Sequence, residues 1–143
     1  VLAFEIMQNH LPVVVGLAQG GAHERTIYEI VGGQEPFFRL VTKFYAGVEN
    51  DPILRPLYPE NLEESIRWTA LFLVQYCGGP ATYSAHKGHP RLRMRHMPFK
   101  IGVAERDAWV KHMNAALETE IEDPFARRFL REYFERTATF LIN

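Results

Sequence analysis

Residues 88–99 read GHPRLRMRHMPF, the most informative stretch of this 143-residue chain. Pro90 suits the first turn of a helix, where the N–H that proline lacks would be unpaired anyway. Pro98 lies two residues after His96, so we expect this short helix to end by His96. Leu92, four residues before His96, then lies on the same helical face.

His96 is the candidate metal ligand of this stretch. A neutral imidazole can bind a metal through one nitrogen while the other donates to a backbone carbonyl. One histidine, an apolar floor and neighbouring arginines suit a haem with two propionates. Taken alone, such a histidine is more often a surface or capped residue, so the rest of the sequence has to separate the two interpretations.

Helical patterns extend on both sides of this stretch, and no alternating β run competes with them. Thr26 and Glu29 have the spacing of a capping box, which begins a short helix. Asp123 and Pro124 form an N-cap and first-turn pair. Apolar repeats predict helices over about 37–48, 62–76, 90–96, 104–117 and 124–141. The sequence therefore predicts an all-α fold, with residues 81–89 as a loop.

Composition narrows the function classes. With 16 Lys and Arg against 17 Asp and Glu, the net charge of -1 predicts no nucleic-acid partner. No apolar run approaches the ~20 residues of a membrane-spanning helix. The single cysteine, Cys77, excludes an internal disulfide framework and indicates a cytoplasmic location. We expect its thiol to be a buried small apolar group rather than a redox sensor. Residues 1–25 are predicted to be an N-terminal extension of unknown role, and 26–143 the folded domain.

Aromatic residues are abundant, at 13% of the chain. Tyr45, Tyr58 and Trp109 each combine apolar bulk with one hydrogen-bond donor, which a pocket for a small polar ligand needs. Taken singly, however, each of these three residues is more often an ordinary aromatic residue of the core.

Several blocks, in this order, resemble the second group of truncated haemoglobins. The blocks are VGG at 31–33, FY at 44–45, DPILRPLYPE at 51–60, FL at 72–73, QYCGGP at 75–80, YS at 83–84, GHPRLRMRH at 88–96 and ERDAW at 105–109. The resemblance implies a globin domain over 26–143, shortened to a two-over-two α-helical sandwich around haem b.

The resemblance also implies the roles of individual residues. His96 would be the proximal ligand of the haem iron, with Tyr45, Tyr58 and Trp109 as distal donors. The remaining cofactor-binding positions fall on residues that pack against the haem or, for Arg95, reach a propionate: Phe44, Phe72, Leu92, Arg95 and Met113.

The sequence departs from the family pattern at four positions. The distal gate position falls on Ser65, and a usually apolar position falls on Thr69. Trp68 takes a cofactor-binding place often held by a basic residue that pairs with a propionate, and Cys77 replaces a frequent tryptophan. The departures imply a more polar distal pocket and the loss of one propionate contact.

The other histidines offer alternatives. His86 and His89 have a ligand spacing only if they share a helix, which Pro90 disfavours. Either could still replace His96 as the haem ligand. His10, His23 and His112 are interpreted as surface residues.

The resemblance implies reversible binding of O2, CO and NO at a five-coordinate haem iron. Three distal donors would slow O2 release, which favours sensing or redox chemistry, such as NO dioxygenase or peroxidase-like activity. O2 storage or delivery, and a haem-free helical interaction module, are the alternatives. An unidentified reductase and a second copy of the chain, as a homodimer, are the further partners considered.

Overall fold

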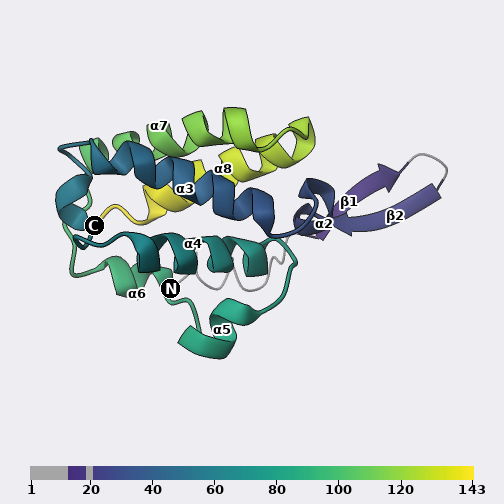
Figure 1. The fold of residues 1–143 in the computed structure, drawn as a ribbon, viewed down its shortest axis with the longest axis horizontal. Helices are drawn as coiled ribbons and strands as arrows, with labels where there is room; N and C mark the ends of the chain where they lie inside the picture. The colour runs from purple at the N-terminus through teal and green to yellow at the C-terminus, as the bar shows by residue number, and fades with distance from the viewer. Residues whose placement is uncertain (1–12, 19–20) are drawn as a thin grey trace.

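The computed structural model describes residues 13–18 and 21–143. Four long helices form its main body (Figure 1): α3 (Glu35–Glu49), α4 (Glu63–Tyr76), α7 (Val103–Glu120) and α8 (Pro124–Phe140). Helix α3 packs against both α4 and α7, and α7 packs against α8. The all-α prediction for the domain is therefore confirmed. In the described part of the chain, no helix has both the length and the apolar character needed to cross a bilayer.

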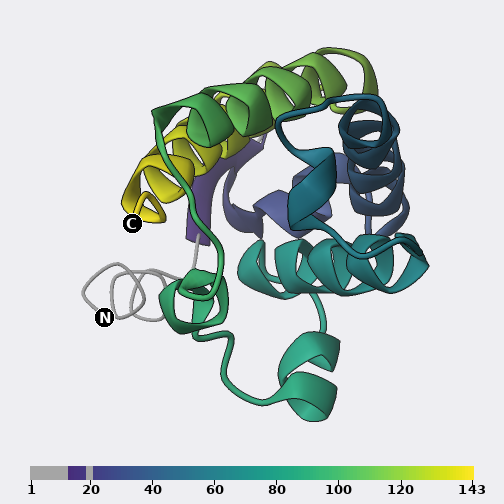
Figure 2. The same cartoon turned by 90° about the vertical axis from the view of Figure 1, so that its left-hand side faces the viewer.

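Shorter helices connect the long ones. These are α2 (Ile27–Val31), the 3-10 turn η1 (Arg55–Leu57), α5 (Thr82–Lys87) and α6 (Leu92–His96). Helices α5 and α6 lie on the side of α4 that faces away from α7, as both ribbon views show (Figure 2). This arrangement leaves the end of α6, with His96, next to the space between α4 and α8.

The predicted helix starts at Thr26 and Asp123 are confirmed. The Thr26 hydroxyl accepts from the Glu29 N–H at 3.1 Å, and the Glu29 carboxylate accepts from the Thr26 N–H at 3.2 Å. Asp123 caps α8 by accepting from the Ala126 N–H at 2.8 Å. Gly32 ends α2 with φ +93°, a left-handed conformation that favours glycine.

The predicted apolar face of α3 is buried. Its side chains, which repeat at helical spacing, belong to one core with residues of α4, α7 and α8: Phe37, Val41, Phe44 and Val48. Burying a side chain of this size contributes about 1.5–3 kcal/mol before entropy is counted.

The prediction of a loop over 81–89 is wrong, because α5 forms there. Gln75 on α4 holds its start: the Gln75 amide oxygen accepts from the Ser84 N–H at 2.8 Å, and its amide nitrogen donates to the Ser84 hydroxyl at 2.7 Å. Tyr83 of α5 is buried, with its ring 5.5 Å from the ring of Phe72 on α4. A helix of six residues fixed by a partner on another helix has too little internal periodicity to be predicted from sequence.

Helix α6 begins two residues later than the prediction, at Leu92 instead of Pro90. Arg91 precedes it with φ 45° and ψ 50°, a left-handed conformation that interrupts helical backbone. Its predicted end at His96 is confirmed.

An antiparallel strand pair precedes α2, although the sequence analysis indicated no strand. Strands β1 (Val13–Ala18) and β2 (Gly21–Thr26) pair from Val13 with Thr26 to Ala18 with Gly21. The β-branched run at 13–15 is a strand signal that the helical interpretation passed over. The strands lie in the predicted extension, except for Thr26 at the end of β2. Residues 1–12 of the extension, which include His10, and residues 19–20 fall outside the described residues.

His112 is not the surface residue that the sequence predicted. Its Nε2 lies 2.7 Å from Oδ2 of Asp51, and its side chain is 21% exposed. The hydrogen bond from His112 holds the pKa of the Asp51 carboxyl below its usual value. The resulting stabilisation is present above the usual carboxyl pKa and is lost as the pH falls through the lower, folded-state pKa. The pair ties the segment before η1 to α7.

We expect Gly47→Ala on α3 to destabilise the protein, although the same change inside a helix usually stabilises. The added methyl carbon would lie 2.4 Å from Nδ1 of His112, whose ring is held by Asp51. Such crowding costs about 1–3 kcal/mol. Urea denaturation checks this, with His112→Ala as the reference background. If Gly47→Ala costs as much in that background, the clash is not the cause.

Candidate functional site

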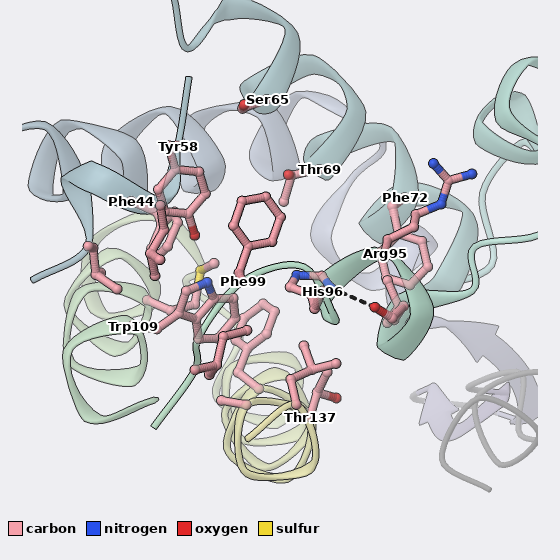
Figure 3. A pocket seen from close by; sticks show the side chains of 18 of the residues that line it. Phe44, Tyr58, Ser65, Thr69, Phe72, Arg95, His96, Phe99, Trp109 and Thr137 are labelled. Carbon is pink, nitrogen blue, oxygen red and sulfur yellow. Dashed lines mark hydrogen bonds between the residues drawn. The ribbon is translucent and has the colours of Figure 1, made fainter. Parts of the chain in front are cut away.

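A cavity of about 370 Å³ lies between α3, α4, α6, α7 and α8, within the size range of ligand pockets. Every site residue predicted from the sequence lines it: Phe44, Tyr45, Tyr58, Ser65, Trp68, Thr69, Phe72, Leu92, Arg95, His96, Trp109 and Met113. Figure 3 shows ten of the lining side chains by name. Residues that are far apart in sequence therefore meet at one site.

The imidazole of His96 projects from the end of α6 toward this cavity (Figure 3). Its Nδ1 lies 2.6 Å from the carbonyl oxygen of Leu92, one turn earlier. A neutral ring that donates from Nδ1 to this carbonyl keeps the lone pair on Nε2, where it can bind a metal. A carbonyl partner on the other nitrogen is the usual way in which proteins orient a histidine ligand. The expected pairing of a backbone carbonyl with His96 is therefore present.

Asn143 fixes the loop that follows His96, and sequence reasoning missed it. Its side-chain amide donates to the carbonyls of Phe99 at 2.7 Å and His96 at 3.3 Å. Its side-chain oxygen accepts from the Ile101 N–H at 3.0 Å, while its own N–H donates to the Ile101 carbonyl at 2.9 Å. One side chain thus ties the end of α6 to the start of α7.

We expect Asn143→Ala to loosen this loop without unfolding the protein. Three side-chain hydrogen bonds disappear, each worth about 0.5–1.5 kcal/mol. Amide hydrogen exchange at residues 99–101 should become several-fold faster, while α3 exchanges as before. Asn143→Asp is the matched control, because it keeps the acceptor for Ile101 and should retain part of the protection. Equal exchange in all three proteins would contradict the assignment.

The predicted distal donors meet on another wall of the cavity. Tyr45 comes from α3, Tyr58 follows η1, and Trp109 lies on α7. The rings of Tyr45 and Tyr58 pack edge to face, 5.3 Å between centroids. Phe44 contacts both sides of this group, 4.9 Å from the Tyr45 ring and 5.2 Å from the Trp109 ring.

Hydroxyl groups of α4 extend this polar cluster. The Tyr45 hydroxyl lies 3.3 Å from the Thr69 hydroxyl, and it also hydrogen-bonds with Ser65. The Tyr58 hydroxyl hydrogen-bonds with Trp109 and with Tyr45. Ser65 and Thr69, two of the four positions that depart from the family pattern, therefore give Tyr45 polar partners.

Both tyrosines are held as neutral phenols. Burial raises the pKa of Tyr58 above its usual value, the neighbouring Tyr45 adds to the rise, and the hydrogen bond with Trp109 partly offsets it. Burial likewise raises the pKa of Tyr45, against the hydrogen bonds that it makes with Thr69, Tyr58 and Ser65. Both O–H groups therefore remain hydrogen-bond donors well above neutral pH.

At the rim of the cavity, the Arg95 side chain is not directed toward a haem propionate, as the resemblance implied, but hydrogen-bonds with the backbone. Its Nε donates to the Pro90 carbonyl at 2.9 Å and its Nη2 to the Lys87 carbonyl at 3.1 Å. The guanidinium thus lies away from the cavity (Figure 3), and the Arg95 side chain stabilises the turn before α6. A propionate contact by Arg95 stays a prediction that would require these hydrogen bonds to rearrange.

Two cations lie over the ring of Trp68 at the rim of the cavity. Its Nε1 donates to the Glu64 carboxylate at 2.7 Å. The Lys87 ammonium lies 4.9 Å and the Arg67 guanidinium 5.2 Å from the ring centroid. Positive charge is therefore retained beside the position where the resemblance implied a lost basic residue.

Sequence reasoning missed the contribution of α8 and of the loop after His96. The apolar repeat over 124–141 predicted a helix without placing it at the site, yet side chains of α8 line the cavity: Tyr133, Phe134, Thr137 and Ala138. Phe99 lines it from the loop. The helical stripe of α8 was a usable signal, because a cofactor pocket and a core present the same apolar pattern.

The alternative metal sites find no support among the described residues, where no group of three His, Cys, Asp or Glu could hold a metal ion. His86 is exposed on α5 and His89 lies after it, and neither lines the cavity. Cys77 is buried, as predicted, and burial raises the pKa of its thiol. The side chain of His23 falls outside the described part of the structure, so its surface position stays a prediction.

Comparison with known proteins identifies the family. The model of the bacterial-like globin family matches residues 26–143. A group 2 truncated haemoglobin of Bacillus subtilis is 40% identical over 116 residues, covering 81% of this chain and 87% of the relative. The chain belongs to the group II truncated haemoglobins. Haem-based binding of diatomic ligands follows from membership of this family.

Solved structures agree with this placement of the globin. A haemoglobin of Chloroflexus aurantiacus has 54% identity and a TM-score of 0.80, covering 84% of this chain and 99% of that one. A truncated oxygen-avid haemoglobin of Bacillus subtilis has 39% identity and a TM-score of 0.79, covering 83% and 100%. The predicted globin-like fold is therefore confirmed.

Proposed function

We propose that the globin binds haem b in this cavity, with Nε2 of His96 as the ligand of the iron. The convergence of three donors, the buried Tyr45 and the partly buried Tyr58 and Trp109, on a cavity that also receives His96 carries the proposal. We assign this function to residues 26–143 and leave the N-terminal extension outside it.

The residues present fit a haem. The cavity is lined by aromatic and aliphatic side chains from six α-helices, which suit the flat apolar macrocycle. His96 offers a nitrogen whose partner nitrogen is already paired with a backbone carbonyl. Cations beside Trp68 suit carboxylate groups at the rim. When bound, the haem supplies an open coordination position and reversible one-electron chemistry.

The side chains would act on a diatomic ligand in three ways. His96 holds the cofactor in a fixed orientation through its hydrogen bond with Leu92. The O–H and N–H groups of the distal donors stabilise negative charge that develops on bound ligand, which slows its release. Phe44 and the other apolar walls exclude water from these hydrogen bonds.

Slow release favours O2 and NO redox chemistry or sensing over delivery. In the oxidation we favour, NO and O2 combine with one electron from a reductant to give nitrate. A reducing compartment such as the cytoplasm would supply this electron. The similarity to an oxygen-avid haemoglobin of Bacillus subtilis supports tight O2 binding, and CO and NO are the further ligands of the same site.

Stopped-flow kinetics on the ferrous protein test this function. We expect O2 to dissociate far more slowly than a cellular carrier requires, and NO added to the oxygenated protein to give stoichiometric nitrate. Rapid O2 release without nitrate would favour storage or delivery. Absence of a haem Soret band in the reconstituted protein would favour an interaction module.

A further inference from the structure

Charge is distributed unevenly along the chain. Residues 65–104 contain no Asp or Glu and six basic residues: Arg67, Lys87, Arg91, Arg93, Arg95 and Lys100. The remaining residues hold all 17 acidic side chains, although the whole chain has a net charge of only -1. The basic stretch comprises most of α4, the helices α5 and α6, and the loop after His96. The positive charge is therefore concentrated on the side of the molecule that carries His96.

Exposed apolar side chains lie in the same stretch. Met94 is 55% exposed, Met97 65% and Phe99 42%, although large apolar side chains are usually buried. Three exposed cations, Lys87, Arg91 and Lys100, lie in the flanking sequence. We call these six residues the α6 surface. Both ribbon views place α6 and α5 at the edge of the molecule, away from α7 (Figures 1 and 2).

The α6 surface adjoins the functional cavity. Met97 follows His96 directly, and Phe99 is partly exposed while it also lines the cavity. A protein that covers this surface would come within a few side chains of His96. Two carboxylates close to the cavity are already engaged: Glu64 accepts from Nε1 of Trp68, and Glu105 accepts from the Gly102 N–H at 2.7 Å.

Basic charge around a small apolar centre is typical of transient electron-transfer contacts, which are small and electrostatically steered. The proposed redox chemistry consumes one electron per turnover, so an electron donor is required. We propose that the α6 surface docks an acidic protein with a one-electron centre, a flavin or an iron–sulfur cluster. This inference rests on the proposed function.

The electron balance of the encounter is simple. The reduced flavin or cluster of the donor would lose one electron, and the haem that His96 would hold would take up that electron. No bond in this chain forms or breaks. A second copy of the globin is a poorer occupant, because a two-fold contact would bring the basic patch against itself.

The test uses the haem-loaded globin and two acidic probes, a [2Fe–2S] ferredoxin and a flavodoxin. Arg91→Asn with Lys100→Glu removes charge from the α6 surface, and asparagine tolerates the left-handed backbone at Arg91. The matched control, Arg128→Asn with Lys111→Glu, makes the same substitutions at exposed positions of α8 and α7. We expect calorimetry to show binding of at least one probe, weakened about ten-fold in the α6 variant and less than about two-fold in the control.

Other outcomes would overturn the proposal. These are no binding of either probe to the wild-type globin, or equal weakening in both variants. Sedimentation of a dimer that only the α6 variant dissociates would assign the surface to a second copy. Selective loss of binding to anionic vesicles or to a DNA oligonucleotide would assign it to a membrane or a nucleic acid. The Soret band of the dithionite-reduced CO complex, measured separately, reports failure of the haem proposal itself.

Discussion

We expect His96→Ala to leave the purified globin without stably bound haem. Among the described residues, His96 is the only histidine that lines the cavity, so none of the other described histidines is placed to replace it. Loss of an outer partner of a metal ligand costs about 10–100-fold in affinity, and loss of the ligand itself should exceed this. Haem titration followed at the Soret band measures the change.

His86→Ala and His89→Ala are the matched controls for this experiment. Each removes an imidazole from the same basic stretch, and each should leave haem affinity unchanged because neither side chain lines the cavity. Circular dichroism of the haem-free His96→Ala protein separates loss of the ligand from loss of the fold. A normal five-coordinate ferrous spectrum in His96→Ala would refute the assignment and return attention to His86 and His89.

We expect removal of a distal donor to accelerate O2 release by about 10–100-fold. Tyr58→Phe and Trp109→Phe each delete one donor and keep an aromatic ring in the cavity. Hydrogen bonds to groups with charge are worth about 1.5–3 kcal/mol, which corresponds to a factor of this size. Stopped-flow displacement of O2 by CO from the ferrous protein measures the off-rate.

The control for distal donation is Tyr76→Phe, which removes a buried hydroxyl that does not line the cavity. Its O2 off-rate should equal that of the wild type. Because Tyr58 is hydrogen-bonded to Trp109 and Tyr45, the effects of Tyr58→Phe and Trp109→Phe on the off-rate should combine non-additively. The raised pKa values of both tyrosines predict an off-rate that does not change with phenol ionisation between pH 6 and about 9. Off-rates that stay at the wild-type value in both variants would refute distal donation.

Local sequence explained the features that depend on local contacts. Thr26 and Glu29 form their capping box within four residues, and His96 finds its carbonyl partner at Leu92 within one turn. Such spacings are visible in a sequence because the interacting atoms belong to one helix. The distal donors came from the family resemblance, since nothing local brings Tyr45 and Trp109 together.

Long-range contacts account for what the sequence did not reveal. Helix α5 depends on Gln75 of the preceding helix, and the loop after His96 depends on Asn143. His112 looked like a surface residue because its partner, Asp51, is 61 positions away. In each case a side chain forms a hydrogen bond with the backbone or the carboxylate of a segment far away in the sequence. Helical periodicity does not reveal such a contact.

The hydrogen bond between Tyr45 and Thr69 in the distal site can run in either direction. Either hydroxyl can donate in this 3.3 Å contact. Without a ligand, the Tyr45 hydroxyl can donate a hydrogen bond to Thr69. When a ligand accepts the hydrogen bond from Tyr45, the Thr69 hydroxyl can rotate and donate to the Tyr45 oxygen. A phenol that accepts one hydrogen bond becomes a stronger donor in the next. Two protons can therefore swing about their oxygens while the heavy atoms stay in place, so the pocket adapts to its ligand with almost no structural reorganisation.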